Sequence, residues 1–287
     1  GKTMSYLIAD SGATKTDWLF VDDDGETTQI RTQGLHPSNI EMLEDSDDIQ
    51  RQVGSLNPAR IYFFGAGCGN PVSDETVRRF LSNVFPGADI RIRSDLHGSG
   101  KAFFGNGDGV VAVLGTGSVS AKISGGAVEK KSAALGFAIG DEGSAADLGK
   151  RILKMYYRKS ATPETIQFLD EKLKSVEYAE MMNRIYRAGK PNRELAAVAG
   201  EVLQYPLPFE VESLISDGFR DFIEYQLSTL NLTGDTPIVF TGKVAEVHQA
   251  VLVSELNKAG YQNVEIRYPV IASFRKRIKS GEPLFEQ

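Results

Sequence analysis

Two short turns of glycine and hydroxyl residues stand between pairs of apolar segments. The first turn covers residues 11–14 and the second covers residues 115–118. A tight turn of small residues exposes several backbone N–H groups, and serine and threonine hydroxyls add further donors. Two such turns could together hold a polyphosphate, although either turn alone is also typical of an ordinary β-hairpin.

A carboxylate precedes the first turn. Asp10 ends an apolar segment, and a carboxylate at the end of a buried strand is costly unless it has a partner such as a metal-bound water. A third turn, at Gly242, connects an apolar segment to a helical one, where glycine lets a phosphate or a flat ring approach a helix N-terminus. Gly242 alone is also typical of a plain strand-to-helix connection. Together the three turns favour phosphate binding, without a Walker A loop or a Rossmann fingerprint.

The elements that must position these turns follow from the apolar pattern. Strands are expected over residues 6–10, 16–21, 26–32, 61–64, 89–93, 110–114, 119–123, 238–240 and 264–267. Helices are expected over residues 41–53, 73–84, 145–158, 163–174, 178–188, 194–203, 209–230, 244–259 and 272–279. His248 is expected at the surface of its helix. A composition shift near residues 105–109 is the predicted domain boundary.

The composition excludes several functional classes. Of the 287 residues, 41% are hydrophobic and 24% charged, as in globular proteins. Cys68 is the only cysteine, which excludes a disulfide scaffold, a zinc finger and a cysteine-ligated cluster housed within one chain. A net charge of −6 argues against nucleic acid as the main partner. No apolar run approaches about 18 residues, and the first residues are too polar for a signal peptide. We therefore expect a cytoplasmic protein with no membrane partner.

Four motifs occur in order at residues 10–18, 65–68, 114–118 and 140–144. With these motifs the sequence resembles the BadF/BadG/BcrA/BcrD ATPase family, and within it the N-acetylglucosamine kinase-like branch. That family belongs to the acetate and sugar kinase/Hsp70/actin superfamily. The similarity runs from about Tyr6 to Pro269.

The resemblance implies an α/β protein of two duplicated RNase H-like (actin-like ATPase) domains around a nucleotide cleft. The N-terminal domain would cover residues 1–107 and would be joined by the C-terminal helix at residues 270–287. The C-terminal domain would cover residues 108–269 and carry a helical insertion. Family members are often dimers, which leaves a homodimer open for this chain.

The resemblance also implies the residues that bind ATP and Mg²⁺. Asp10 would hold Mg²⁺, through water. The first phosphate loop would be formed by Gly12, Ala13, Thr14 and Lys15. The second loop would be formed by Gly115, Thr116 and Gly117, and Gly242 would lie beside the adenosine.

On the acceptor side, Asp95 matches the catalytic base of the sugar kinases in the superfamily. The resemblance implies that the substrate is contacted by Asp95, His36, Gly67, Thr116, Asp141 and Glu142. The residues themselves also allow plainer interpretations. Asp95 could be the N-cap of the following helix, and Asp141 and Glu142 could be a charged first turn favoured by the helix dipole.

These residues predict an ATP-dependent kinase that phosphorylates a small sugar. The first candidate for that substrate is an amino sugar such as N-acetylglucosamine or glucosamine. Two alternatives stay open. One is a nucleotide-binding protein without kinase activity, which Val119 and His36 favour because the family usually has asparagine at both places. The other is an activator of 2-hydroxyacyl-CoA dehydratases, but those activators use two cysteines from each chain, and this chain offers Cys68 alone.

Overall fold

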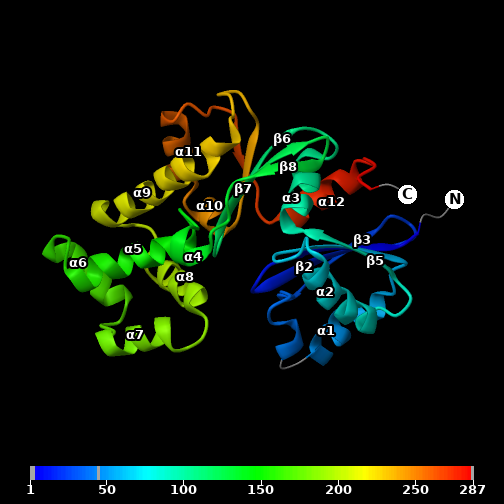
Figure 1. The fold of residues 1–287 in the computed structure, drawn as a ribbon, viewed down its shortest axis with the longest axis horizontal. Coiled ribbons are helices and arrows are strands. Elements are labelled where there is room, and N and C mark those ends of the chain that lie inside the picture. The colour runs from blue at the N-terminus through cyan, green and yellow to red at the C-terminus, as the bar shows by residue number, and fades with distance from the viewer. Residues whose placement is uncertain (1–3, 44–45, 286–287) are drawn as a thin grey trace. The chain divides into compact units, whose positions relative to one another are not determined.

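The computed structural model describes residues 4–43 and 46–285. These residues form two compact units. The first contains the described residues up to Gly107, together with Ser124–Val128 and the chain from Pro269 onward. The second contains Asp108–Ile123 and Glu129–Tyr268. Each unit is built on one five-stranded sheet with helices (Figure 1), which confirms the predicted α/β class with a duplicated core.

The sheet of the first unit has the strand order β3-β2-β1-β4-β5. Its strands are β1 (Tyr6–Ser11), β2 (Lys15–Val21), β3 (Thr27–Gln33), β4 (Arg60–Gly65) and β5 (Asp89–Ser94). β1 and β2 form an antiparallel hairpin that β3 extends, whereas β4 runs parallel to β1 and β5 parallel to β4. The carboxyl ends of β1, β4 and β5 therefore meet at one edge of the sheet.

Helices cover both faces of this sheet (Figure 1). They are η1 (Ile40–Met42), α1 (Ser46–Val53), η2 (Gly54–Leu56), α2 (Pro71–Val84), α3 (Asp95–Phe104) and α12 (Val270–Lys279). Because successive side chains of a strand point to opposite faces, Phe63 joins the core that contains residues of α1 and α2. The ring of its neighbour Phe64 stacks on Phe274 of α12. The C-terminal helix is thus part of the first unit.

The sheet of the second unit repeats this topology in the order β10-β9-β6-β7-β8. Its strands are β6 (Gly109–Leu114), β7 (Ser118–Ser124), β8 (Ala127–Lys131), β9 (Ile238–Thr241) and β10 (Val264–Ile266). β6 and β7 form the antiparallel hairpin, and β9 runs parallel to β6 as β4 runs parallel to β1. The duplicated strand–turn–strand element of the sequence is therefore the centre of each sheet.

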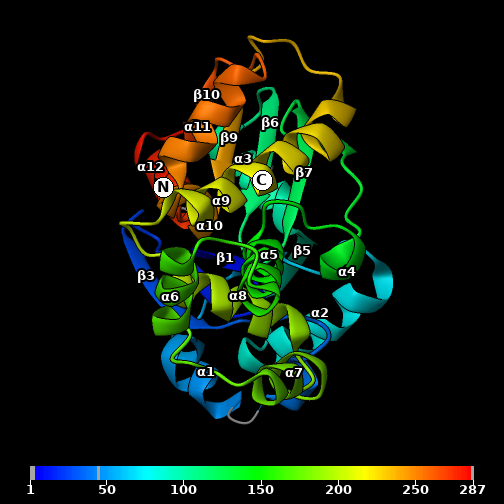
Figure 2. The ribbon, with the colours of Figure 1, turned by 90° about the vertical axis from the view of Figure 1, so that its left-hand side faces the viewer.

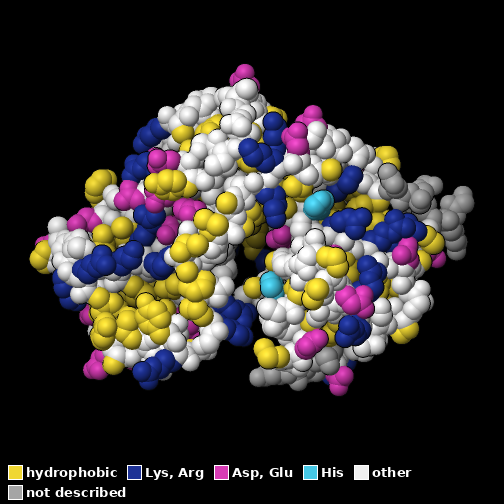
Figure 3. Space-filling view, viewed as in Figure 1, with side chains coloured by type: hydrophobic (Ala, Val, Ile, Leu, Met, Phe, Trp, Pro, Cys, Tyr) yellow, Lys and Arg dark blue, Asp and Glu magenta, His cyan; other side chains and the backbone are white. Residues whose placement is uncertain are grey.

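The helices of the second unit share one core with β6 and β9, and α9 and α11 lie over the sheet in Figure 2. They are α4 (Gly136–Ile139), α5 (Ala145–Arg158), α6 (Pro163–Lys172), α7 (Tyr178–Tyr186), α8 (Pro191–Val202), α9 (Phe209–Tyr225), η3 (Leu227–Leu230), α10 (Lys243–Val247) and α11 (Gln249–Lys258). Apolar side chains gather at the surface around α7 in Figure 3. Tyr178 and Tyr186 are 64% and 77% exposed there, and this surface carries none of the predicted site residues.

Several elements differ from the prediction. The helix expected over residues 209–230 ends at Tyr225, and the helix expected over residues 244–259 is interrupted at His248. The surface position expected for His248 is wrong, because its side chain is 4% exposed and its Nδ1 lies 2.9 Å from the Tyr205 hydroxyl. β8 was not predicted, since most of its side chains are exposed and polar. The helix expected over residues 41–53 begins at Ser46, and its residues 44–45 lie outside the described residues.

Within the described ranges, no helix is long and apolar enough to cross a membrane.

We expect Gly149→Ala to destabilise the second unit, because α5 and α8 cross in contact at this glycine. A Cβ added at Gly149 would lie 1.9 Å from the backbone oxygen of Leu195, so the two helices would have to move apart. The free energy of unfolding should fall by about 1–3 kcal/mol, measured as a lower Tm by calorimetry. The matched control is Gly200→Ala in α8, where an added Cβ meets nothing within 4 Å. Helix propensity should raise stability there by about 0.5–1 kcal/mol, and equal effects of the two substitutions would refute the close-contact account.

Candidate active site

The carboxyl edge of the first sheet brings together residues from three segments of the sequence. In the strand register Ser11 pairs with Gly65 and Gly65 pairs with Ser94. The backbone N–H of Ala66 donates to the Ser11 oxygen at 2.8 Å. In open α/β sheets, ligands bind outside the carboxyl ends of parallel strands. Asp10, the loop that contains Gly67, and Asp95 therefore lie at the edge where such a site is expected.

The first turn is closed and supported by its own backbone and by neighbouring hydroxyls. The Gly12 N–H donates to the Lys15 oxygen at 2.9 Å, and the hydroxyls of Ser11 and Thr16 hydrogen bond to each other at 2.8 Å. The N–H of Leu35 donates to the Ser11 hydroxyl at 3.1 Å, which fixes the loop leading to His36 against the turn. These hydroxyls are used within the protein.

Both turns keep backbone donors without partners. Among the described residues, no hydrogen bond is made by the N–H groups of Ala13 and Thr14 in the first turn or of Thr116 and Gly117 in the second. The Thr14 side chain is exposed. Successive unpartnered N–H groups in a turn form a concave anion-binding surface. Each turn can therefore accept phosphate oxygens through its backbone.

The surroundings of Asp10 disfavour the ionised form of its carboxyl group. Burial, together with the nearby carboxylates of Asp95 and Asp17, raises the pKa of Asp10 to about 7, although Lys15 acts in the opposite direction. A carboxylate with a raised pKa gains most from a cation that restores its ionised form. A cation beside Asp10, such as the predicted Mg²⁺ held through water, would therefore stabilise the ionised form of this carboxylate.

His36 is held as a neutral donor beside the glycine loop. Its Nδ1 accepts the backbone N–H of Ser38 at 3.1 Å, which leaves the proton of the neutral ring on Nε2. A Cβ added at Gly67 would lie 2.7 Å from that Nε2. Burial lowers the pKa of His36, and Asp95 acts in the opposite direction. The first unit therefore brings together Asp10, His36, Gly67 and Asp95.

Asp95 is the first residue of α3 and not its cap. The N-cap is Ser94, whose hydroxyl accepts the N–H of His97. The N-cap interpretation of Asp95 is thus wrong. Its Oδ1 accepts the N–H of Leu96 at 3.0 Å, and the start of a helix favours a negative charge. The fold keeps this carboxylate at the edge of the sheet without using it to cap the helix.

The second turn lies beside Gly242. β6 and β9 are parallel neighbours, and a Cβ added at Gly242 would lie 2.2 Å from the Leu114 oxygen. Gly242 has φ 109°, which further requires glycine. The buried hydroxyl of the preceding Thr241 has no hydrogen-bond partner in the described structure. The close approach of the Leu114 backbone thus accounts for the glycine at 242, and the place of Gly242 beside an adenosine stays a prediction.

The loop of Asp141 and Glu142 is fastened to the second turn. The N–H of Ser118 donates to Asp141 Oδ1 at 3.2 Å, and the Ser118 hydroxyl donates to the Glu142 backbone oxygen at 2.8 Å. Burial raises the pKa of Asp141, which the Ser118 N–H partly offsets. α5 begins after its N-cap Ser144. The interpretation of these acids as a charged first turn is therefore wrong, since both precede the cap.

Gln226 is a member of this group that the sequence analysis missed. It is 1% exposed, and its Nε2 donates to the Ser118 hydroxyl at 2.8 Å and to Glu142 Oε1 at 3.0 Å. The signal in the sequence was a polar residue on an apolar helix face, because Gln226 follows Phe222 and Ile223 by four and three residues. The second unit thus brings together the turn, Asp141, Glu142, Gly242 and Gln226.

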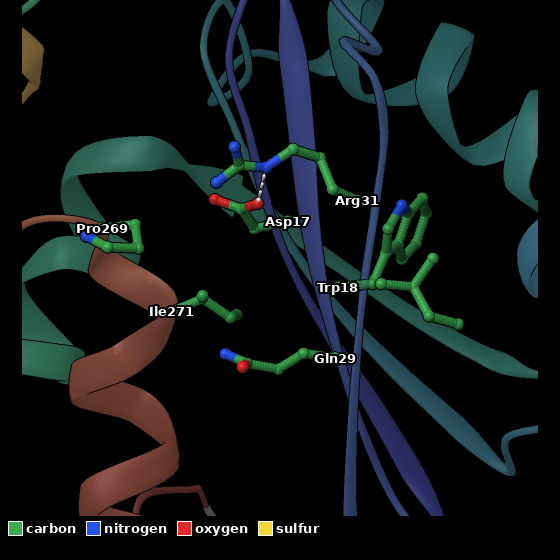
Figure 4. Close-up of a pocket in the computed structure, with 7 residues that line it drawn as sticks. Asp17, Trp18, Gln29, Arg31, Pro269 and Ile271 are labelled. Atoms are coloured by element: carbon green, nitrogen blue, oxygen red, sulfur yellow. Dashed lines mark hydrogen bonds and ion pairs between the residues drawn. The ribbon is translucent and has the colours of Figure 1, made fainter.

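A cavity of about 220 Å³ lies in the first unit beside β2 and β3 (Figure 4). It is lined by Asp17, Trp18, Gln29, Ile30, Arg31, Pro269 and Ile271. In Figure 4 the Arg31 guanidinium lies over Asp17, with its Nε 2.7 Å from Asp17 Oδ1. Asp10 and Asp17 are cross-strand partners, as are Asp17 and Arg31. Arg31 thus offsets one of the two negative charges next to Asp10, and no predicted site residue lines the cavity.

Solved structures of other proteins share the fold of this chain. No protein-family model matches the sequence, and no curated protein matches it. The chain is similar to the structure of a candidate N-acetylglucosamine kinase from Porphyromonas gingivalis, with 27% identity and a TM-score of 0.83 over 96% of this chain and 99% of that chain. A candidate N-acetylglucosamine kinase from Chromobacterium violaceum is 18% identical, with a TM-score of 0.71 over 96% of this chain and 99% of that one.

A third solved structure is more distant. The ROK family glucokinase from Streptomyces griseus, in complex with glucose and AMPPNP, is 13% identical, with a TM-score of 0.52 over 96% of this chain and 98% of that chain. The duplicated sheets and these likenesses define an actin-like ATPase fold of two RNase H-like units. Within that class, the chain resembles the N-acetylglucosamine kinase-like branch of the BadF/BadG/BcrA/BcrD ATPase family, as its motifs predicted.

We expect Asp10→Asn to stabilise the metal-free protein at pH 8 and to have little effect near pH 4. The pKa of Asp10 rises from 3.8 to about 7 on folding, so the folded protein keeps a proton that the unfolded chain has lost. Wild-type stability contributed by this group therefore falls as pH rises from about 4 to 7, by about 2–4 kcal/mol. The measurement is the free energy of unfolding across pH 4–8 in the presence of EDTA.

The control is Asp235→Asn, an exposed carboxylate on a loop, which should change stability by less than about 0.5 kcal/mol at every pH. Mg²⁺ with ATP should raise the Tm of the wild type but not of Asp10→Asn. A stability difference that does not vary with pH would show that folding does not raise the pKa of Asp10.

Proposed function

We propose that this protein is an ATP-dependent sugar kinase, which transfers the γ-phosphoryl group of ATP to a hydroxyl of a small sugar. The observation that carries the proposal is the pair of carboxylates at the carboxyl edge of the first sheet. The Asp95 carboxylate is close enough to Asp10 to help raise its pKa, and a cation bound at Asp10 would offset that repulsion. The similarity to a candidate N-acetylglucosamine kinase over nearly the whole chain supports it.

ATP would be bound mainly by backbone groups. Gly12, Ala13, Thr14 and Lys15 would contact the β- and γ-phosphates as one loop, and Gly115, Thr116 and Gly117 as the other. The unpartnered N–H groups of both turns support this assignment. Gly242 would lie beside the adenosine. Asp10 would hold Mg²⁺, and bound Mg²⁺ would supply neutralisation of the phosphate charge.

Asp95 would act as general base. As the sugar oxygen forms its bond to the γ-phosphorus, Asp95 accepts the hydroxyl proton, and the bond from the γ-phosphorus to the β–γ bridging oxygen breaks, so that ADP leaves. Because phosphoryl transfer needs positioning more than covalent help, the neutral Nε2–H of His36 would serve as a donor that orients the acceptor.

We further propose an amino sugar, such as N-acetylglucosamine or glucosamine, as the acceptor. Its contacts would be His36, Gly67, Asp95, Thr116, Asp141 and Glu142. The candidate kinases with the same fold support this class of substrate. The two compact units support a first domain that ends at residue 107 and includes the C-terminal helix from residue 270, with the second domain between them. A homodimer stays open as part of the proposal.

A second candidate function is nucleotide binding without kinase activity. Val119, a half-buried residue directly after the second turn, favours it, because an apolar side chain cannot donate a hydrogen bond to an acetamido group or a hydroxyl.

We expect Asp95→Asn to lower kcat by about 10²- to 10⁴-fold, the range typical of a lost general base, with the KM for ATP changed by less than about threefold. The wild type and variant would be compared by ADP formation in the presence of Mg²⁺ over a panel of hexoses and amino sugars. Asp235→Asn is the control that should retain wild-type kcat.

Three outcomes would count against the proposal. Full activity in Asp95→Asn would remove Asp95 from the chemistry. Nucleotide binding by calorimetry without turnover on any sugar would favour the binding protein. Iron in the purified protein, with ATP hydrolysis that no sugar stimulates, would favour the dehydratase activator.

A further inference from the structure

A buried glutamine joins the proposed acceptor loop to the second phosphate turn. Gln226 follows α9, and its side chain reaches Ser118 in the turn and Glu142 in the loop. Resting on the proposed function, we propose that Gln226 is a positioning residue, which fixes the Glu142 carboxylate as an acceptor for hydroxyl groups of the sugar.

The hydrogen bonds determine how the Gln226 amide is turned. The Ser118 hydroxyl donates its one hydrogen to the Glu142 backbone oxygen at 2.8 Å, so toward Gln226 it must accept. The atom of Gln226 that faces Ser118 is therefore its Nε2. On the other side, Gln226 Oε1 accepts from the Ser132 hydroxyl at 2.9 Å. The position thus requires a side chain that both donates and accepts.

Gln226 donates a hydrogen bond to one carboxylate oxygen of Glu142 and makes none to the other. Its Nε2 donates to Glu142 Oε1 at 3.0 Å. In the part of the chain that the structure describes, Glu142 Oε2 has no hydrogen-bond partner. A neutral amide orients the carboxylate without cancelling its charge, whereas lysine or arginine at this place would neutralise it. The carboxylate is left as a directed acceptor, which suits the hydroxyl groups of a sugar.

Further hydrogen bonds, which do not involve Gln226, also join the loop and α5 to the turn. Ser118 holds both the backbone of Glu142 and the side chain of Asp141. The N–H of Ala145, at the start of α5, donates to the Gly115 oxygen at 2.8 Å. Loss of the Gln226 amide would remove the hydrogen bond to the Glu142 side chain, while the hydrogen bonds from Ser118 to the loop and from Ala145 to Gly115 would remain. This separates the effect on the acceptor from the effect on the nucleotide.

The first variant tests the hydrogen bond. Gln226→Met keeps the length of the side chain but removes its donor. The KM for the sugar should rise about tenfold or more, as expected for a lost hydrogen bond to a charged group, while the KM for ATP changes by less than about twofold. Gln204→Met, an exposed glutamine after α8, is the matched control and should leave both constants unchanged. A lower Tm with an unchanged sugar KM would assign Gln226 a purely structural role and overturn the proposal.

The second variant tests the contact with Glu142 itself. Gln226→Glu places two carboxyl groups within hydrogen-bond distance, so they must share a proton. The ratio of the sugar KM in the variant to that in the wild type should be near one at pH 5.5 and rise at least tenfold by pH 8. Taking the ratio removes the effect of the charged groups that both proteins share, among them Asp10, Asp141, Asp147 and Lys150. A ratio that is constant with pH would show that Gln226 does not act through Glu142.

Failure of this inference and failure of the proposed function are distinct results. If the wild type phosphorylates no sugar, the proposed function fails and the role of Gln226 fails with it. If the wild type is active and both variants keep the wild-type sugar KM, only the role of Gln226 is refuted.

Discussion

Each sheet pairs an antiparallel hairpin with a parallel neighbour, and this pairing is the constraint on which both groups of candidate residues depend. Because β4 runs parallel to β1 and β5 parallel to β4, the chain leaves all three strands at one edge, where Asp10 and Asp95 lie. The same relation between β6 and β9 sets Gly242 against the backbone of Leu114. A slip of one residue in either pairing would turn every side chain of the strand to the opposite face. The register therefore determines which side chains can take part in chemistry.

The electrostatics of the first unit cost stability at neutral pH. Burial and two neighbouring carboxylates raise the pKa of Asp10 to about 7, although Lys15 lies near and Arg31 is paired with Asp17. A purely structural position could be filled by asparagine without this cost. Strongly shifted pKa values gather at functional sites. A bound cation would offset the repulsion, which gives the unfavourable carboxylate a reason to be present.

Features of the fold that have a local sequence pattern could be predicted from the sequence. Features that arise from tertiary contacts could not. Apolar runs and glycine turns predicted both hairpins, because a buried strand and a tight turn each have a local signature. Ser94 and Asp95 are both capping types, so only the backbone could show that Ser94 is the cap. β8 has too few apolar residues to be read as a strand. Gln226 lay within a predicted helix, and only the contact with Ser118 and Glu142 shows why a polar residue is buried there.

The two sheets share a topology but divide their polar chemistry. The first carries charge, through Asp10 and Asp95, whereas around the second turn a neutral network of Ser118, Ser132 and Gln226 holds the acidic loop. In both turns the first glycine N–H closes the turn, and the hydroxyl of the flanking serine, Ser11 or Ser118, is used within the protein. What the duplicated turns have in common is thus their backbone and not their side chains. A phosphate would be met in the same way by both, through main-chain N–H groups that only small flanking residues leave accessible. This explains why both turns contain glycine and threonine while the residues around them differ.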